Sequence, residues 1–189
     1  MKRLKAALCA LWLLAALGAQ ASDLAQKLQS ADHVLLMRHT LAPGIGDPAN
    51  YRLDDCKTQR NLSAEGRAHA TFTGLWLKKQ GVTQAKVYSS PWCRCKDTAA
   101  LLKFGEATVT PALASFFDDM RQARASQLAL EQFIAEQLKT KGSQALILVT
   151  HHVNILEFAG ENIDSGDMVL ARVNARGQML SYQRVARPQ

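Results

Sequence analysis

Three short apolar runs constrain the fold of this chain more than any other feature of its sequence. They are "HVLLMRH" (33–39), "AKVYSS" (85–90) and "QALILVTH" (144–151), and each ends at polar residues. Runs of this length with few polar residues are typical of strands covered on both faces. Helical patterns occupy the segments around them, at 63–80, at about 92–103 and at 121–140. N-cap and glycine stop signals bound the first and last of these helices.

Strands that alternate with helices predict right-handed crossovers and a mainly parallel sheet. The tail "DMVLARVNARGQMLSYQRV" instead predicts two strands joined at "NARG", a hairpin that completes the sheet. We therefore expect a single α/β domain. It should be a three-layer sandwich, with helices on both faces of the central sheet and a β-hairpin at the C-terminus.

Residues 1–21 have the features of a secretory signal peptide. Three basic residues precede the apolar stretch "AALCALWLLAALG", and the small-x-small sequence "AQA" at 19–21 predicts cleavage before Ser22. A retained membrane anchor is the alternative, but the stretch is shorter than the roughly 20 residues that a span needs. We expect a mature domain of residues 22–189 that is periplasmic or secreted and is not stably inserted in a membrane.

The charge of the mature chain argues against nucleic acid as a partner. The formal net charge of +7 falls to +4 without the signal peptide, which carries three basic residues and no acidic one. So modest an excess, with no basic run and no interleaved aromatic residues, is not typical of a nucleic-acid-binding surface. It is compatible with a small anionic substrate.

Three cysteines remain after cleavage: Cys56, Cys93 and Cys95. In an exported protein we expect one disulfide and one free thiol. A bond between Cys93 and Cys95 would strain the backbone, so Cys56 should pair with one of them. A zinc site is the weaker alternative, because the sequence has no paired C-x-x-C spacing.

The segment 41–60, "LAPGIGDPANYRLDDCKTQR", contains two prolines and two glycines and has no periodicity. Loops of this length inside a compact domain are usually functional. It begins just after His39. If the end of the first strand is a site, this loop should form its wall, and Cys56 is where a disulfide could anchor it.

The ends of the three predicted strands share an unusual chemistry. Arg38 and His39 close the first run, Arg94 follows the second, and His151 and His152 follow the third. In open α/β sheets, ligands bind beyond the carboxyl ends of the strands. Arginine presents a planar fork of donors that matches phosphate oxygens and stays charged at any working pH. The sequence therefore predicts a pocket for a tetrahedral oxyanion.

These motifs together resemble the histidine phosphatase superfamily, also called the phosphoglycerate mutase-like family. The Arg-His pair after its first strand is matched by "LLMRHT", its Ser-Ser-Pro segment with arginine and Thr-Ala by "YSSPWCRCKDTA", and its second histidine by "LILVTHH". Its Leu-Ser/Thr-x-x-Gly-x-x-x-Ala helix start is matched by "RNLSAEGRAHA". The match runs in order from 33 to 155. Thr40 departs from the pattern, since many members have glycine there.

The resemblance implies a role for each polar residue at the strand ends. His39 would be the nucleophile and form a phosphohistidine, while Arg38, Arg94 and His151 hold the phosphoryl oxygens. A neutral imidazole attacks phosphorus, and clustered cations stabilise the charge on the oxygens and lower the pKa of the nucleophile. His151 would have to be cationic or a neutral hydrogen-bond donor to contribute. Because arginines neutralise the phosphoryl group, we expect no metal and no cofactor. His152 is expected to pack or hydrogen bond behind His151.

A leaving alkoxide needs a proton, so an acid should lie near the pocket. "ASFFDDM" places Asp118 and Asp119 in the region where family members keep their proton donor, more often a glutamate. Asp118 is the preferred candidate. The alternative is that both residues cap a helix that begins near Met120. Glu157 and Asp54 are the next candidates.

The position of Arg94 favours one cysteine pairing. Cys93 directly precedes Arg94, so a bond from Cys56 to Cys93 would tether the long loop to the strand end that presents a phosphate ligand. We predict this pairing, with Cys95 free.

The mature chain has room for the family's core and the 41–60 loop alone, whereas mutases and phytases of the family are commonly larger. The resemblance therefore implies an exported, metal-independent phosphomonoesterase that acts on a small phosphorylated substrate through a phosphohistidine. A phosphohistidine protein phosphatase is one alternative. A non-catalytic anion-binding protein on the same fold is another.

Overall fold

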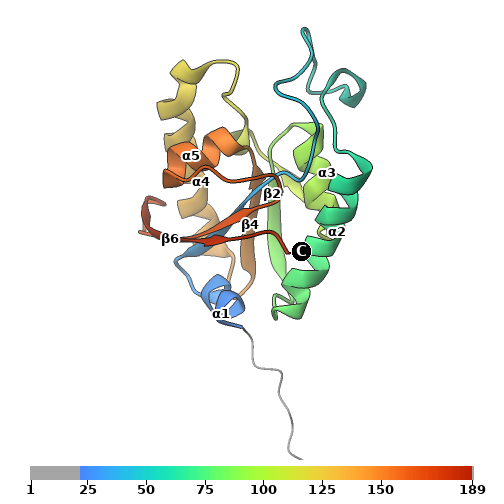
Figure 1. Ribbon diagram of the computed structural model, residues 1–189. Coiled ribbons are helices and arrows are strands. Elements are labelled where there is room, and N and C mark those ends of the chain that lie inside the picture. Colours follow the sequence, from blue (N-terminus) through green and yellow to red (C-terminus); the bar gives the residue numbers. More distant parts are fainter. Residues whose placement is uncertain (1–21, 189) are drawn as a thin grey trace, which may run out of the picture.

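The computed structural model describes residues 22–188, so the predicted signal peptide lies outside the described residues. Within 22–188, six strands form one sheet in the order β3-β2-β4-β1-β5-β6 (Figure 1). The strands are β1 (His33–Arg38), β2 (Ala85–Ser89), β3 (Thr108–Val109), β4 (Ala145–Thr150), β5 (Met168–Val173) and β6 (Met179–Val185). The four strands from β3 to β1 run parallel, and β5 and β6 pair antiparallel. The predicted mainly parallel sheet with a C-terminal hairpin is confirmed.

Helices cover both faces of the sheet, as predicted. They are α1 (Asp23–Gln29), α2 (Ala64–Lys79), α3 (Cys93–Leu101), α4 (Ala123–Thr140) and α5 (His152–Ala159). Figure 1 shows α2 and α3 on one side and α4 and α5 on the other. Leu35 and Met37 of β1 pack in one hydrophobic cluster with residues of α1, α2 and α3, whereas Val34 and Leu36 pack in a second cluster with residues of α4 and α5. The alternation of the strand thus builds two cores, and the three-layer sandwich is confirmed.

The two helices that the sequence patterns did not predict are both short. α1 has seven residues and α5 has eight, which is too few turns for an apolar period to stand out. α5 starts immediately after β4, so that His151 occupies its N-cap position. The third predicted helix begins two residues later than expected because a 3-10 turn, η3 (Met120–Gln122), precedes α4.

The N-terminus of α2 packs directly against the backbone that follows β1. Ser63 caps the helix by accepting from the Gly66 N–H, and its own N–H donates to the Leu41 carbonyl at 3.0 Å. A Cβ at position 66 would lie 2.1 Å from the same carbonyl oxygen. Glycine is therefore required here by the close approach of two backbones, and this contact fixes the chain two residues beyond His39.

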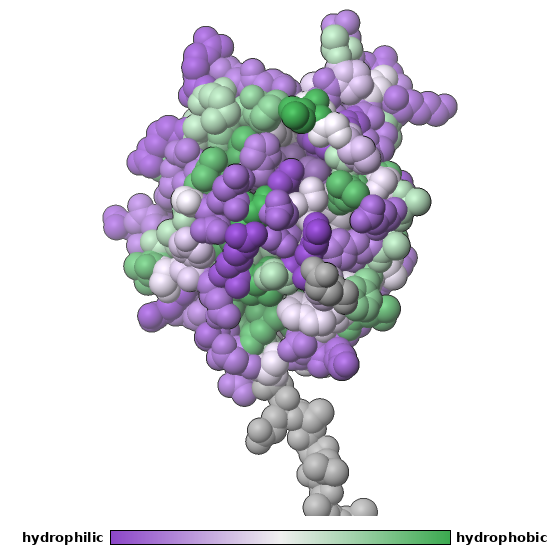
Figure 2. All heavy atoms as spheres, in the orientation of Figure 1, coloured by the Kyte–Doolittle hydropathy of each residue, from purple (hydrophilic) through white to green (hydrophobic). Residues whose placement is uncertain are grey.

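Residues 41–60 form a flap at the carboxyl ends of the parallel strands. The flap projects from the body at the top of the molecule, and its one regular element is a 3-10 turn, η1 (Cys56–Thr58) (Figure 1). Figure 2, in the same orientation, shows a face on which polar side chains predominate and apolar ones are scattered. None of the helices in residues 22–188 is long and apolar enough to cross a membrane.

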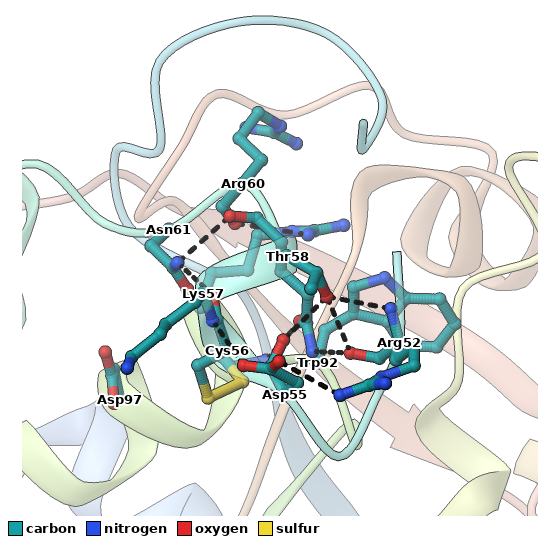
Figure 3. Close-up of a disulfide and its surroundings, with 12 residues drawn as sticks. Arg52, Asp55, Cys56, Lys57, Thr58, Arg60, Asn61, Trp92 and Asp97 are labelled. Carbon is teal, nitrogen blue, oxygen red and sulfur yellow. Dashed lines mark hydrogen bonds and ion pairs between the residues drawn. A yellow bond between two sulfur atoms is a disulfide. The ribbon is translucent and has the colours of Figure 1, made fainter. Parts of the chain in front are cut away.

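A disulfide joins the flap to the first residue of α3. Cys56 and Cys93 are bonded, with their Cα atoms 5.7 Å apart, and Cys95 is free and buried, as predicted (Figure 3). Around the bond, Arg52 pairs with Asp55 at 3.1 Å, and the Thr58 hydroxyl donates to the Asp55 carbonyl at 2.7 Å. The outer part of the flap is thus a hydrogen-bonded turn with one covalent anchor.

Removing this anchor should destabilise the protein. Cys56 and Cys93 are 37 residues apart, and a crosslink over such a loop contributes about 3 to 4 kcal/mol through the unfolded chain. We expect C56S/C93S to lose about that much in urea unfolding. Dithiothreitol should lower the stability of the wild type toward that of the variant and leave the variant unchanged. Equal stability of oxidised wild type and variant would contradict this account.

Candidate active site

The carboxyl ends of β1, β2 and β4 open into a cavity of about 330 Å³ beneath the flap. Its lining combines basic, acidic and aromatic side chains from the strand ends, the flap and the loop after β3. These are Arg38, His39, Gly44, Ile45, Gly46, Asp47, Arg60, Trp92, Arg94, Ser115, Phe117, Asp118, His151, His152 and Asn162. All five residues predicted to form the site are therefore brought together.

His39 lies at the base of the cavity and is 2 % exposed. Its backbone N–H donates to the Thr150 carbonyl at 3.0 Å, and its Nδ1 lies 2.8 Å from the Thr40 carbonyl. Because a carbonyl only accepts, Nδ1 carries the proton and Nε2 keeps a free lone pair. Burial, assisted by the charges of nearby arginines, lowers the pKa of His39 to about 3. His39 is thus a neutral imidazole with a defined nucleophilic atom.

His151 faces His39 from the end of β4. The two rings are 5.6 Å apart between centroids and inclined by 70°. Burial, followed by the proximity of His39 and Arg94, lowers the pKa of His151 well below its usual value. The Ser90 hydroxyl lies 2.7 Å from Nε2 of His151. The ring proton of a neutral His151 is on Nδ1 when this hydroxyl donates to Nε2, and on Nε2 when Nδ1 accepts from Nη2 of Arg94, which lies 3.5 Å away.

Arg94 and Arg38 each have a buried N–H group that donates no hydrogen bond to residues 22–188. Arg94 lies in the first turn of α3 with its Nη2 3.5 Å from Nδ1 of His151. Arg38, the last residue of β1, donates from Nη1 to the Ile163 carbonyl at 2.7 Å. Within residues 22–188 the Nε of each arginine is buried and has no hydrogen-bond partner. Buried donors of this kind suit an oxyanion.

Arg60 is a third arginine of the cavity, which the sequence motifs did not predict. Its Nε donates to the Gly46 carbonyl at 2.7 Å and its Nη1 to the Ala42 carbonyl, so that the flap folds around its side chain. Its charge also lowers the pKa of His39 and of His151, although burial is the largest cause of both shifts and the effect of Arg60 is smaller. One signal was available: Arg60 closes the long loop directly before the "NLSAEG" helix start.

The two candidate acids separate in the structure. Asp118 lines the cavity, is exposed, and accepts a hydrogen bond from the Tyr51 hydroxyl of the flap at 3.1 Å. Asp119 instead caps η3 by accepting from the Arg121 N–H and pairs with the Arg121 guanidinium at 2.7 Å. The capping alternative is thus confirmed for Asp119, and only Asp118 of the pair reaches the site.

The other two candidate acids lie outside the cavity. Asp54 sits on the outer flap with its side chain 84 % exposed, 3.5 Å from the Arg52 guanidinium. Glu157 is exposed on α5. Neither belongs to the cavity lining.

His152 lies in the cavity lining, so the prediction that it packs behind His151 is wrong. As the first residue of α5, it projects toward the N-terminal end of the helix, which faces the site. Its ring lies 5.7 Å from that of Phe117, inclined by 59°. Burial, followed by the charges of Arg38 and Arg60, lowers the pKa of His152.

Positive charge in this site comes from side chains. Within residues 22–188, no group of three or more His, Cys, Asp or Glu is arranged so that it could hold a metal ion. The arrangement offers a neutral nucleophile, a second imidazole and three guanidinium groups around one cavity. It can bind a tetrahedral anion and place its central atom near the Nε2 of His39.

Comparison with known proteins agrees with this geometry. A family model of the histidine phosphatase superfamily (branch 1) matches residues 34–123. The matched segment includes Arg38, His39, Arg94 and Asp118. His151 lies outside this segment, and the fold brings it into the same cavity. No protein of curated function matches the sequence significantly.

Solved structures share the fold at low sequence identity. The protein histidine phosphatase SixA complexed with tungstate is 20 % identical, with a TM-score of 0.55, over 82 % of this chain and 96 % of that chain. A mycobacterial glucosyl-3-phosphoglycerate phosphatase in complex with VO3 is 14 % identical, with a TM-score of 0.56, over 82 % and 98 %. A phosphoserine phosphatase from Entamoeba histolytica, in complex with 3-phosphoglyceric acid, is 12 % identical, with a TM-score of 0.55, over 81 % and 97 %.

The matched family model, the strand-end motifs and the shared fold give one assignment. Residues 34–123 match the histidine phosphatase superfamily, and the described domain shares its fold with the protein histidine phosphatase SixA.

The neutral state of His39 predicts how stability depends on pH. Because its pKa is about 3 in the folded protein and about 6.5 in an unfolded chain, the unfolded state binds more protons between these values. The free energy of unfolding should therefore fall as pH decreases from about 6.5 to about 3, by at most about 1.4 kcal/mol per pH unit for this group. H39Q, which does not titrate, should show a shallower slope in urea unfolding at pH 7, 6 and 5. An unchanged slope would contradict the assigned protonation state.

Proposed function

We propose that this protein is an exported phosphomonoesterase that hydrolyses a small phosphorylated substrate through a phosphohistidine on His39. The observation that carries the proposal is the neutral His39, with its Nε2 free, at the base of a cavity lined by three arginines. A nucleophile surrounded by fixed donors matches the requirements of phosphoryl transfer, which depends on positioning and on electrostatic stabilisation.

The first half-reaction forms the phosphoenzyme. Nε2 of His39 attacks phosphorus, the bond from phosphorus to the leaving oxygen breaks, and Asp118 supplies a proton to that oxygen. Arg38, Arg94 and His151 would hold the phosphoryl oxygens, His151 by donating from Nδ1 in the tautomer in which the Ser90 hydroxyl donates to Nε2. Because these donors are fixed before the substrate arrives, charge that develops in the transition state is stabilised without reorganisation.

The second half-reaction regenerates the enzyme. Water attacks phosphorus, its proton passes to the Asp118 carboxylate, and the bond from phosphorus to Nε2 breaks. Inorganic phosphate is released and His39 returns to its neutral form. All the charges used belong to side chains of the described chain, and the proposal includes no metal and no cofactor.

The compartment is part of the same proposal. The disulfide between Cys56 and Cys93 supports it, because structural disulfides persist in oxidising compartments. The predicted signal peptide, which the described residues do not include, gives the route. We infer a periplasmic or secreted location.

A phosphohistidine protein phosphatase is the second candidate, and the fold shared with SixA favours it. Its leaving group would be an imidazole nitrogen. The exposed position of Asp118 leaves space beside the site for a phosphorylated side chain of a partner protein. Side-by-side rates on a phosphohistidine peptide and on sugar phosphates would choose between the two.

Loss of the nucleophile should abolish activity. We expect H39A to show no hydrolysis of p-nitrophenyl phosphate, whereas H152A retains most of it, since a residue beside the site usually contributes much less than the nucleophile. Acid-labile, base-stable phosphate should be trapped on wild-type protein quenched during turnover and be absent from H39A. Phosphate binding with no turnover and no trapped phosphate would instead identify a non-catalytic anion-binding protein.

The assignment of Asp118 predicts a dependence on the leaving group. D118N should strongly slow phosphoenzyme formation from alkyl phosphates and spare phosphoenzyme formation from p-nitrophenyl phosphate, followed as the burst of p-nitrophenol, because this leaving group departs without protonation. D119N, the matched control on the neighbouring cap, should change neither rate by much. An equal loss for D118N on both substrates would indicate a positioning role instead of proton donation.

A further inference from the structure

Asp47 is a buried carboxylate inside a cavity that should bind an anion. It belongs to the flap and lines the cavity, and its side chain is 3 % exposed. A negative charge at this place repels a phosphate, so its presence requires a physical reason. An aspartate before a proline in a loop is ordinary turn chemistry, so no sequence motif singles out Asp47.

Both carboxylate oxygens of Asp47 accept hydrogen bonds. Oδ1 accepts from the Arg60 backbone N–H at 2.9 Å and from Nη1 of Arg94 at 3.0 Å. Oδ2 accepts from the same Nη1 at 3.0 Å and from the Trp92 indole N–H at 3.1 Å. A carboxyl group whose two oxygens face N–H donors is suited to accept, and it has no free position from which to deliver a proton to a leaving group.

These contacts determine which edge of Arg94 remains available. In a guanidinium group, Nε and Nη2 share one edge, and Nη1 points away from it. Asp47 holds Nη1, while Nη2 lies 3.5 Å from Nδ1 of His151 and Nε has no partner within the described chain. The edge that is left lies beside His151, whose ring is 5.6 Å from that of His39 between centroids. Two parallel N–H groups on one edge match two oxygens of a phosphate.

We propose that Asp47 is a positioning residue that orients the Nε and Nη2 edge of Arg94 toward the bound anion and so makes anion binding depend on the flap. The identity of the anion as a phosphoryl group rests on the proposed function. The remaining acceptor near Nη1 is the Arg60 carbonyl at 3.5 Å, which is too long to hold the guanidinium by itself.

The flap is built to keep Asp47 in place. Arg60 holds the carbonyls of Gly46 and Ala42, on the same side of the loop as Asp47. The disulfide fixes the far end of the flap to Cys93, the neighbour of Arg94. Trp92, which Figure 3 shows beside the anchored turn, completes the group through its indole N–H. The Asp47 carboxylate is therefore held by the Arg60 N–H of its own loop and by Trp92 and Arg94 at the start of α3.

The test is binding of inorganic phosphate, measured by calorimetry at fixed ionic strength, which does not require turnover. We expect D47A and the isosteric D47N to weaken phosphate binding about tenfold or more. Both variants lose the charge-assisted hydrogen bonds between Asp47 and Nη1 of Arg94, so the guanidinium is no longer held in the orientation that binds the anion. D54N, on the exposed part of the same flap, is the matched control and should stay within about twofold of wild type. Far-UV circular dichroism and thiol titration establish that each variant is folded and keeps its disulfide.

A double-mutant cycle with Arg94 separates positioning from a general structural role. If Asp47 acts through Arg94, D47N should weaken phosphate binding in the wild type and have almost no further effect in R94A. Equal losses in both backgrounds would overturn the proposal, and so would unchanged or tighter binding in D47N, which would mean that Asp47 merely repels the anion. Failure of the wild type to bind phosphate would overturn the proposed function as well. Wild-type binding without turnover would overturn the enzymatic function alone.

Discussion

Three arginine side chains share one cavity, and their mutual repulsion is the constraint that the surrounding structure must satisfy. Each guanidinium is held by an acceptor: Arg38 by the Ile163 carbonyl, and the other two by the flap, Arg60 through backbone carbonyls and Arg94 through Asp47. Burying charges is costly unless they are paired and hydrogen bonded. The flap and the turn after α5 therefore have the same physical effect: they supply the acceptors that offset the repulsion among the three guanidinium groups. The disulfide holds the flap in place.

The same positive charge determines the state of the histidines. An imidazole that is buried beside guanidinium groups loses its proton, and the pKa of His39 and that of His151 are both lowered for this reason, with burial as the larger cause. The arginines therefore help to keep His39 neutral, as the proposed nucleophile must be, and the same charges would neutralise a bound phosphate. The carbonyl of Thr40 then selects the tautomer by accepting from Nδ1. Protonation state and tautomer thus follow from two separate features, one electrostatic and one geometric.

The parts of the site that follow strands could be predicted, because register determines them. β4 lies between β1 and β2, and Arg38 is aligned with Thr150, so residues just beyond these strands must meet. The pairing of Cys56 with Cys93 also has a local cause: residues two apart on a helix point about 200° apart, and Cys95 faces the Thr150 carbonyl inside the protein. Asp47 and the position of His152 could not be predicted, because they depend on the path of an aperiodic loop and on a helix too short to show a period. Arg60 had one signal, its place directly before the start of α2, but its position in the cavity also depends on the path of the loop.

The sheet and the flap each supply part of the site. The sheet is held by backbone hydrogen bonds, and the flap is anchored by its disulfide. The strand ends fix Arg38, His39 and His151, the proposed nucleophile and two proposed phosphoryl ligands, through backbone hydrogen bonds, which tolerate little displacement. The flap brings one carboxylate and one guanidinium, and it also narrows the entrance, since a Cβ at Gly46 would lie 3.8 Å from the Phe117 ring. In the proposed function, the steps common to all phosphate esters therefore depend on the strand ends. Selection among substrates should reside where the flap meets Phe117 and Asp118, because the part of a substrate beyond its phosphate must pass between them.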